Sequence, residues 1–126
     1  MSQCQWKLVI HGGAGAMRPD HGDDDHEQRA RQGLRDALDA GSAILSGGGS
    51  AIDAVEAAVR VLEDDPCFNA GRGSTLNAEG VVELDAAIMD GASRRAGAVA
   101  GVRSTRAPIS LARVLMERGP HVFLSY

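Results

Sequence analysis

Glycine-rich segments contain the residues whose types and spacing could support chemistry. The first is His11 followed by Gly-Gly-Ala-Gly, directly after a short apolar run, where missing side chains let the backbone approach a ligand closely. It differs from a dinucleotide-binding motif, because Arg18 stands where the third glycine belongs, and from a P-loop, because no Gly-Lys-Ser/Thr follows. Residues 48–52 fail as a serine-hydrolase nucleophile motif, since isoleucine replaces the last glycine. The turn at His11 is either a tight turn packed against a sheet or a loop that meets a ligand.

A second segment, residues 68–74 (Phe-Asn-Ala-Gly-Arg-Gly-Ser), places one amide side chain next to glycines. Asn69 could orient a substrate or a nucleophile. The other interpretation is a turn asparagine that hydrogen-bonds to nearby backbone, and the local sequence favours it.

The residues just before this segment break a rule of helix electrostatics. Glu63, Asp64 and Asp65 end an expected helix, where the unpaired carbonyls already present negative charge. A cation could resolve the conflict, and carbonyl and carboxylate oxygens suit sodium, potassium or calcium better than zinc. A solvated acidic helix end is the alternative, because the penalty is only a few tenths of a kcal/mol to ~1 kcal/mol.

Other polar residues carry weaker signals. Asp85 lies in an expected apolar strand, so its carboxylate either has a buried partner or faces solvent on one side of the sheet. His21 and His26 flank three aspartates and could bind a metal ion together with them. A polar loop is the favoured interpretation of this segment. His11 and His121 fit hydrogen-bonded structural histidines better than a catalytic pair. Cys67 has no base at a suggestive spacing and is interpreted as packing.

Two helices are expected to position these groups in the first half of the chain. Residues 6–10 form a short apolar run typical of a buried strand, and residues 17–25 form a polar loop. From about His26 to Leu45, apolar residues recur on one helical face, and three glycines then end the helix. Ser50, with Asp53 three residues later, predicts the start of a second helix that runs as far as Pro66. Two helices joined by a glycine turn are expected to pack antiparallel.

The second half of the chain changes to a strand pattern. Alternating apolar residues predict a hairpin of residues 73–76 and 81–89 around the turn at 77–80. Residues 96–102 predict a strand of glycine, alanine and valine, residues 108–118 a helix with proline in its first turn, and residues 121–126 a last strand. This order predicts an α/β or α+β layered fold whose sheet needs more strands than the chain supplies.

Composition limits the function classes. The chain has 126 residues, 44% of them hydrophobic and 24% charged, which predicts one globular domain portion spanning residues 1–126. No apolar run is long enough to span a bilayer and no signal pattern opens the chain, so a cytoplasmic protein without membrane contact is expected. Thirteen basic against seventeen acidic residues argue against a nucleic-acid partner. Cys4 and Cys67 form no disulfide framework.

Five segments taken together resemble a known family. In order, residues 10–15, 50–55, 68–74, 83–91 and 96–102 resemble the plant-type L-asparaginase and isoaspartyl peptidase family. Each motif alone is weak, but the ordered set with compatible gaps is specific, and it runs from about Trp6 to the last residue.

The resemblance implies the N-terminal (α) subunit of an N-terminal-nucleophile hydrolase with a four-layer αββα sandwich of the α+β class, completed by a second (β) subunit. Family members cut their own precursor before a threonine, assemble as (αβ)2, and hydrolyse the side-chain amide of L-asparagine and β-aspartyl peptide bonds. The freed threonine supplies both the nucleophilic hydroxyl and the amine that acts as base. The two threonines here, Thr75 and Thr105, stand in segments unlike the family's Gly-Thr-x-Gly cleavage segment, so the nucleophile is expected outside this chain and the chain alone is expected to be inactive.

The resemblance also implies site residues. Asn69 would lie beside the nucleophile, and His11, Gly12, Gly13 and Gly15 would line the cleavage region. No organic cofactor is implied, and a structural sodium ion, with potassium as the alternative, would be bound by the main-chain carbonyls of Leu62, Glu63, Asp65, Phe68, Ala70 and Arg72. Some family members carry an aliphatic residue in place of Arg72, a difference that a backbone ligand tolerates.

Three alternatives stay open. A glycosylasparaginase-like amidase shares the fold and the threonine chemistry, and a taspase-type protease is a second enzyme of this kind. A non-catalytic α/β module that binds an anion through its glycine loops is the alternative from another class.

Overall fold

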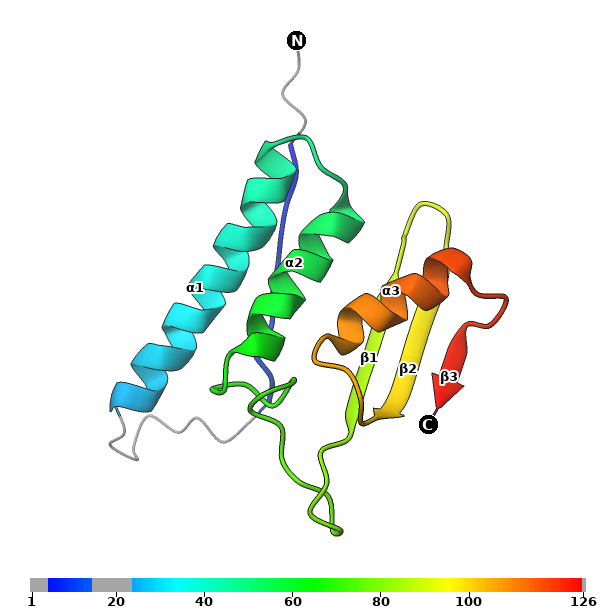
Figure 1. Cartoon of the computed structure of the whole chain (residues 1–126). Coiled ribbons are helices and arrows are strands. Elements are labelled where there is room, and N and C mark those ends of the chain that lie inside the picture. Colours follow the sequence, from blue (N-terminus) through cyan, green and yellow to red (C-terminus); the bar gives the residue numbers. More distant parts are fainter. Residues whose placement is uncertain (1–4, 15–23, 126) are drawn as a thin grey trace.

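The computed structural model describes residues 5–14 and 24–125, an α+β arrangement of helices on a small mixed sheet. A pair of long helices packs side by side, and a shorter helix lies across the strands (Figure 1). The elements, in chain order, are α1 (Asp24–Ser46), α2 (Ala51–Asp64), β1 (Leu84–Met89), β2 (Ala96–Val102), α3 (Pro108–Arg118) and β3 (Phe123–Ser125). No helix in this part of the chain is long and apolar enough to cross a membrane.

Small residues allow α1 and α2 to pack closely and antiparallel, as predicted (Figure 1). Ala37 and Ala58 are 0% and 1% exposed, and a Cβ added to Gly41 would lie 3.1 Å from the carbonyl oxygen of Ala54. Ser50 begins α2 as predicted, since its hydroxyl accepts the backbone N–H of Asp53 at 3.1 Å. Both predicted helices are confirmed.

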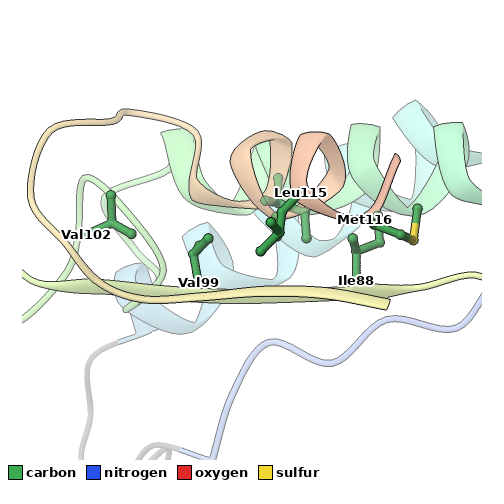
Figure 2. Close-up of a cluster of buried hydrophobic side chains, with 7 residues drawn as sticks. Ile88, Val99, Val102, Leu115 and Met116 are labelled. Atoms are coloured by element: carbon green, nitrogen blue, oxygen red, sulfur yellow. The ribbon is translucent and has the colours of Figure 1, made fainter. Parts of the chain in front are cut away.

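The sheet has the order β1-β2-β3, with β1 antiparallel and β3 parallel to β2. Helix α3 covers one face, where its Leu115 and Met116 meet Val99 and Ile88 of the strands (Figure 2). A Cβ on Gly97 would lie 2.2 Å from a carbonyl oxygen of α3, so the helix rests directly on the backbone of β2. The bounds of β2 and α3 match the predicted ones.

Two strand predictions were wrong and one was too long. Residues 6–10 form no strand in the described part of the chain; they run extended beside α1 and α2, with Val9 90% exposed (Figure 1). The predicted hairpin shrinks to a single bridge between Leu76 and Val82, and β1 pairs with β2 instead. The last strand is limited to β3. A strand needs a neighbour to complete its ladder, and apolar alternation does not show where that neighbour lies.

Candidate functional site

The last turn of α2 and the turns that follow it, residues 62–75, are hereafter called the carbonyl loop. Pro66 has no N–H and so cannot donate to the carbonyl of Leu62, four residues back. Helix α2 accordingly ends at Asp64, and the helix-end carbonyls must find other partners.

The carbonyl loop returns to the end of α2 through its backbone. The N–H of Arg72 donates to the carbonyl of Glu63 at 2.9 Å, and Ser74 N–H donates to the carbonyl of Gly71 at 3.1 Å. A Cβ on Gly71 would lie 2.3 Å from the Glu63 carbonyl oxygen, a clash that leaves room only for glycine. The glycines of this segment therefore serve a close backbone approach.

Phe68 attaches the carbonyl loop to the rest of the protein. It is 4% exposed and packs in a cluster with Ala37 and Leu62. Its ring also lies 3.1 Å from the place where a Cβ of Gly12 would be. The structure thus brings the first glycine turn against the carbonyl loop, two segments that are far apart in the sequence.

The glycine turn itself is held by a local hydrogen bond. The N–H of Gly13 donates to Nδ1 of His11 at 3.0 Å, and Gly13 has φ +107°, a left-handed conformation that favours glycine. His11 is exposed, and Gly15 lies outside the described residues.

Asn69 is exposed on the carbonyl loop, and its side chain hydrogen-bonds to nearby backbone, as expected of a turn asparagine. Its Oδ1 accepts the N–H of Thr75 at 3.0 Å, which closes the loop. The amide NH2 group has no hydrogen-bond partner among the described residues. Asn69 therefore has a fixed oxygen and two free donors, an arrangement that can stabilise a developing negative charge but cannot take up a proton.

Each of the three carboxylates at the end of α2 has a hydrogen-bond or ion-pair partner within the protein. Asp64 pairs with Arg106 at 2.8 Å, and Asp65 accepts the N–H of Cys67 at 2.8 Å. Glu63 is 2% exposed, and its Oε1 accepts the backbone N–H of Ile109 at 2.8 Å, at the start of α3. Arg106 thus neutralises part of the negative charge at the end of α2.

The second oxygen of Glu63 is an exception. Oε2 is buried with no hydrogen-bond partner within the described part of the chain. Burial raises the pKa of Glu63 to about 7, and the hydrogen bond from Ile109 and the charge of Arg60 oppose this shift only in part.

Main-chain oxygens of the carbonyl loop are the groups that could hold a small, hard cation. A Cβ on Gly73 would lie 2.3 Å from the Phe68 carbonyl oxygen and 2.4 Å from that of Pro66, so both oxygens lie against the Gly73 backbone and leave no room for a side chain there. The Pro66 carbonyl is not among the six that the resemblance implies. No group of three or more His, Cys, Asp or Glu side chains suited to a metal occurs in residues 5–14 and 24–125. Neutral backbone oxygens of the kind that this loop offers suit sodium or potassium.

The six carbonyls implied by the resemblance are not equally free. Those of Glu63 and Asp65 each already accept a backbone N–H, from Arg72 and Phe68. The carbonyls of Phe68, Ala70 and Arg72 accept no backbone N–H from the described residues. The carbonyl of Leu62 stands four residues before Pro66, which has no N–H to donate to it. Each carbonyl oxygen has two lone pairs, so the two occupied ones can still bind an ion.

The sequence matches the asparaginase family over residues 4–126. The chain belongs to this family. It is 53% identical over 118 residues to isoaspartyl peptidase/L-asparaginase of Bos taurus, 49% over 117 to plant-type L-asparaginase of Pyrococcus abyssi, and 46% over 117 to isoaspartyl peptidase of Salmonella typhimurium. These matches cover 94%, 93% and 93% of this chain and 37% of each relative, so the chain spans little more than a third of their length.

Other polar residues of this asparaginase-family chain have structural roles. Asp85 is exposed, and its Oδ1 accepts the N–H of Gly101 at 2.8 Å beside a bulge in the β1–β2 ladder, so it is both solvent-facing and partnered. His26 lies in α1 with Nδ1 3.9 Å from the Cys67 sulfur, and His21 lies outside the described residues. Burial, together with the nearby charge of Asp65, raises the pKa of Cys67, which agrees with the packing interpretation and opposes a nucleophilic thiolate.

Proposed function

We propose that this chain is the N-terminal, α-subunit part of a threonine hydrolase that cleaves the side-chain amide of L-asparagine and β-aspartyl peptide bonds. The observation that carries the proposal is the identity of 46–53% over at least 93% of the chain to proteins named for these two activities. The nucleophilic threonine, its amine base and the groups that bind the substrate's charges would come from the part of the relatives that this chain does not span.

Within that reaction, the chain's own contribution would be the Asn69 amide. Its oxygen already accepts Thr75 N–H, which holds the side chain so that its NH2 group can donate toward the nucleophile's hydroxyl or the oxyanion of the acyl intermediate. The glycine turn at His11 would line the same region, because it packs against Phe68, the residue next to Asn69.

We further propose a sodium or potassium ion bound by the carbonyl loop. The ion would supply positive charge among the carbonyl oxygens of the loop and so fix the segment that carries Asn69; it would take no part in bond breaking. The carbonyls of Phe68, Ala70 and Arg72, which accept no backbone N–H from the described residues, support this.

The rest of the precursor is proposed to cover the open parts of this structure as the β subunit, giving the four-layer αββα sandwich and an (αβ)2 assembly. Small side chains such as Ala98 and Ala100 lie on β2 and would permit a second sheet to pack closely. An apolar groove of about 370 Å³, lined in part by Leu111, Val114 and Leu124, lies between α3 and β3. Phe123 of β3 is 56% exposed. Surfaces of this kind are typical of sites that another chain segment covers.

The experiment begins with the complete precursor. Denaturing intact-mass measurement and N-terminal sequencing should find a second chain that begins with threonine. The purified protein should then release ammonia from L-asparagine and the C-terminal residue from β-aspartyl dipeptides. A single uncleaved species without either activity would overturn the proposal, and preference for glycosylated asparagine would assign the amidase alternative.

A further inference from the structure

The side chain of Glu63 connects two helices from a buried position. Its Oε1 accepts the N–H of Ile109 at 2.8 Å, in the first turn of α3. Helix α3 has no cap of its own there: Ala107 at the N-cap makes no side-chain hydrogen bond, and Pro108 follows it. The helix thus takes a capping acceptor from a residue 46 positions earlier in the chain.

The backbone of the same residue sets the course of the carbonyl loop. Its carbonyl accepts Arg72 N–H at 2.9 Å. A Cβ on Gly71 would lie 2.3, 2.9 and 3.0 Å from the oxygen, carbon and Cα of Glu63, so the loop rests directly on this residue. Any movement of Glu63 must therefore move Gly71 and Arg72.

Among the described residues, the other charged links from α2 to α3 and the segment before it lie nearer the start of α2 or are exposed. Arg113 joins α3 to Asp53 and Glu56, which lie in the first two turns of α2, far from the loop. Near the loop, the second link is the Asp64–Arg106 pair, whose side chains are 45% and 74% exposed. Exposed pairs of this kind contribute little because water and salt screen them.

We propose that the Glu63 side chain is a positioning residue: by accepting Ile109 N–H in a buried place, it fixes the end of α2 against α3 and thereby fixes the carbonyl loop and Asn69. The part of this inference that concerns Asn69 rests on the proposed function. The carboxylate touches no substrate; it acts through the loop.

The test compares three variants of the complete precursor by amide hydrogen exchange. Glu63→Met fills the space but offers no strong acceptor, Glu63→Gln keeps an oxygen that can accept Ile109 N–H, and Val99→Ala is the control. Val99 is 4% exposed in the core under α3, so its truncation lowers stability without contact to the loop. The informative amides are those of Arg72 and Thr75, compared with amides in the second half of α1, which lies outside the core cluster of Val99.

Loss of a buried acceptor is expected to speed exchange at Arg72 and Thr75 by roughly five- to hundredfold in Glu63→Met, relative to α1. In Glu63→Gln the change should stay within about threefold. In Val99→Ala the ratio of loop to α1 exchange should not change. The self-cleavage rate should fall in Glu63→Met alone. If Glu63→Met does not fold, Glu63→Asp, which shortens the reach of the carboxylate, is measured in the same way.

Unchanged exchange at both amides in Glu63→Met would overturn the inference, and so would an equal effect of Val99→Ala on the loop. The exchange measurement needs neither cleavage nor activity. A precursor that does not cleave itself would therefore contradict the proposed function, while the exchange ratios still decide the role of Glu63.

Discussion

Replacing Arg113 should reveal how strongly charge joins α2 to α3. Its guanidinium lies 2.7 Å from Asp53, 2.6 Å from Glu56 and 2.7 Å from Glu117, and its side chain is 24% exposed. Exposed pairs contribute roughly 0–1 kcal/mol and hydrogen bonds to charged groups about 1.5–3 kcal/mol. For this half-buried group we expect Arg113→Leu to lower the free energy of unfolding by about 2 kcal/mol at pH 7.

The loss should depend on pH with a defined sign. Burial alone would raise the pKa of Glu56, but hydrogen bonds from Ser110 and Arg113 and the guanidinium's charge bring it below its ordinary value of 4.5. A lowered pKa means that this stabilisation is complete above about pH 4.5 and disappears as the pH falls through the lower, folded-state value. In Arg113→Leu, three carboxylates also repel one another at neutral pH and cease to do so when protonated.

Urea unfolding of the complete protein at pH 7 and pH 3.5 measures both effects. The destabilisation by Arg113→Leu should be smaller at the lower pH. Arg31→Leu is the matched control, because Arg31 forms a single exposed pair with Glu27 and should cost less than about 0.5 kcal/mol at either pH. Equal destabilisation by Arg113→Leu at both pH values would refute the electrostatic explanation and assign the loss to packing.

Three further outcomes are expected. Asn69→Asp keeps the acceptor for Thr75 N–H but loses the NH2 donors, so the thermal unfolding temperature should change little while kcat falls about 10²–10³-fold. Asn69→Ala loses the acceptor as well, so both the unfolding temperature and kcat should fall. Full activity of either variant would remove the catalytic role. Gly71→Ala places a Cβ 2.3 Å from the Glu63 carbonyl oxygen and should lower the free energy of unfolding by about 1–3 kcal/mol in urea titrations; a neutral effect would contradict the loop geometry. Replacing sodium by choline at constant ionic strength should lower Tm, and adding sodium back should restore it; an unchanged Tm would argue against the ion.

Local signals in the sequence determined the helices and one strand. Apolar periodicity, the Ser50 cap and the proline at the start of α3 predicted helices that the structure confirms, because these signals act within a few residues of one another. The strand at residues 96–102 was predicted with the bounds that the structure has, and α3 packs directly on the backbone of its Gly97. The ordered motifs predicted family membership, which the match over residues 4–126 confirms.

Only the tertiary structure decided which distant groups meet. Residues 6–10 have a strand-like pattern but no ladder partner among the described residues, and pairing is a property of two segments. Asp85 was an open choice between burial and exposure until the bulge placed Gly101 N–H within its reach. Glu63 looked like one of three charges at a helix end, yet it alone is buried, because α3 returns from 46 residues later to place Ile109 against it. Burial and partner choice depend on contacts that close long loops, and no local pattern in a single sequence encodes them.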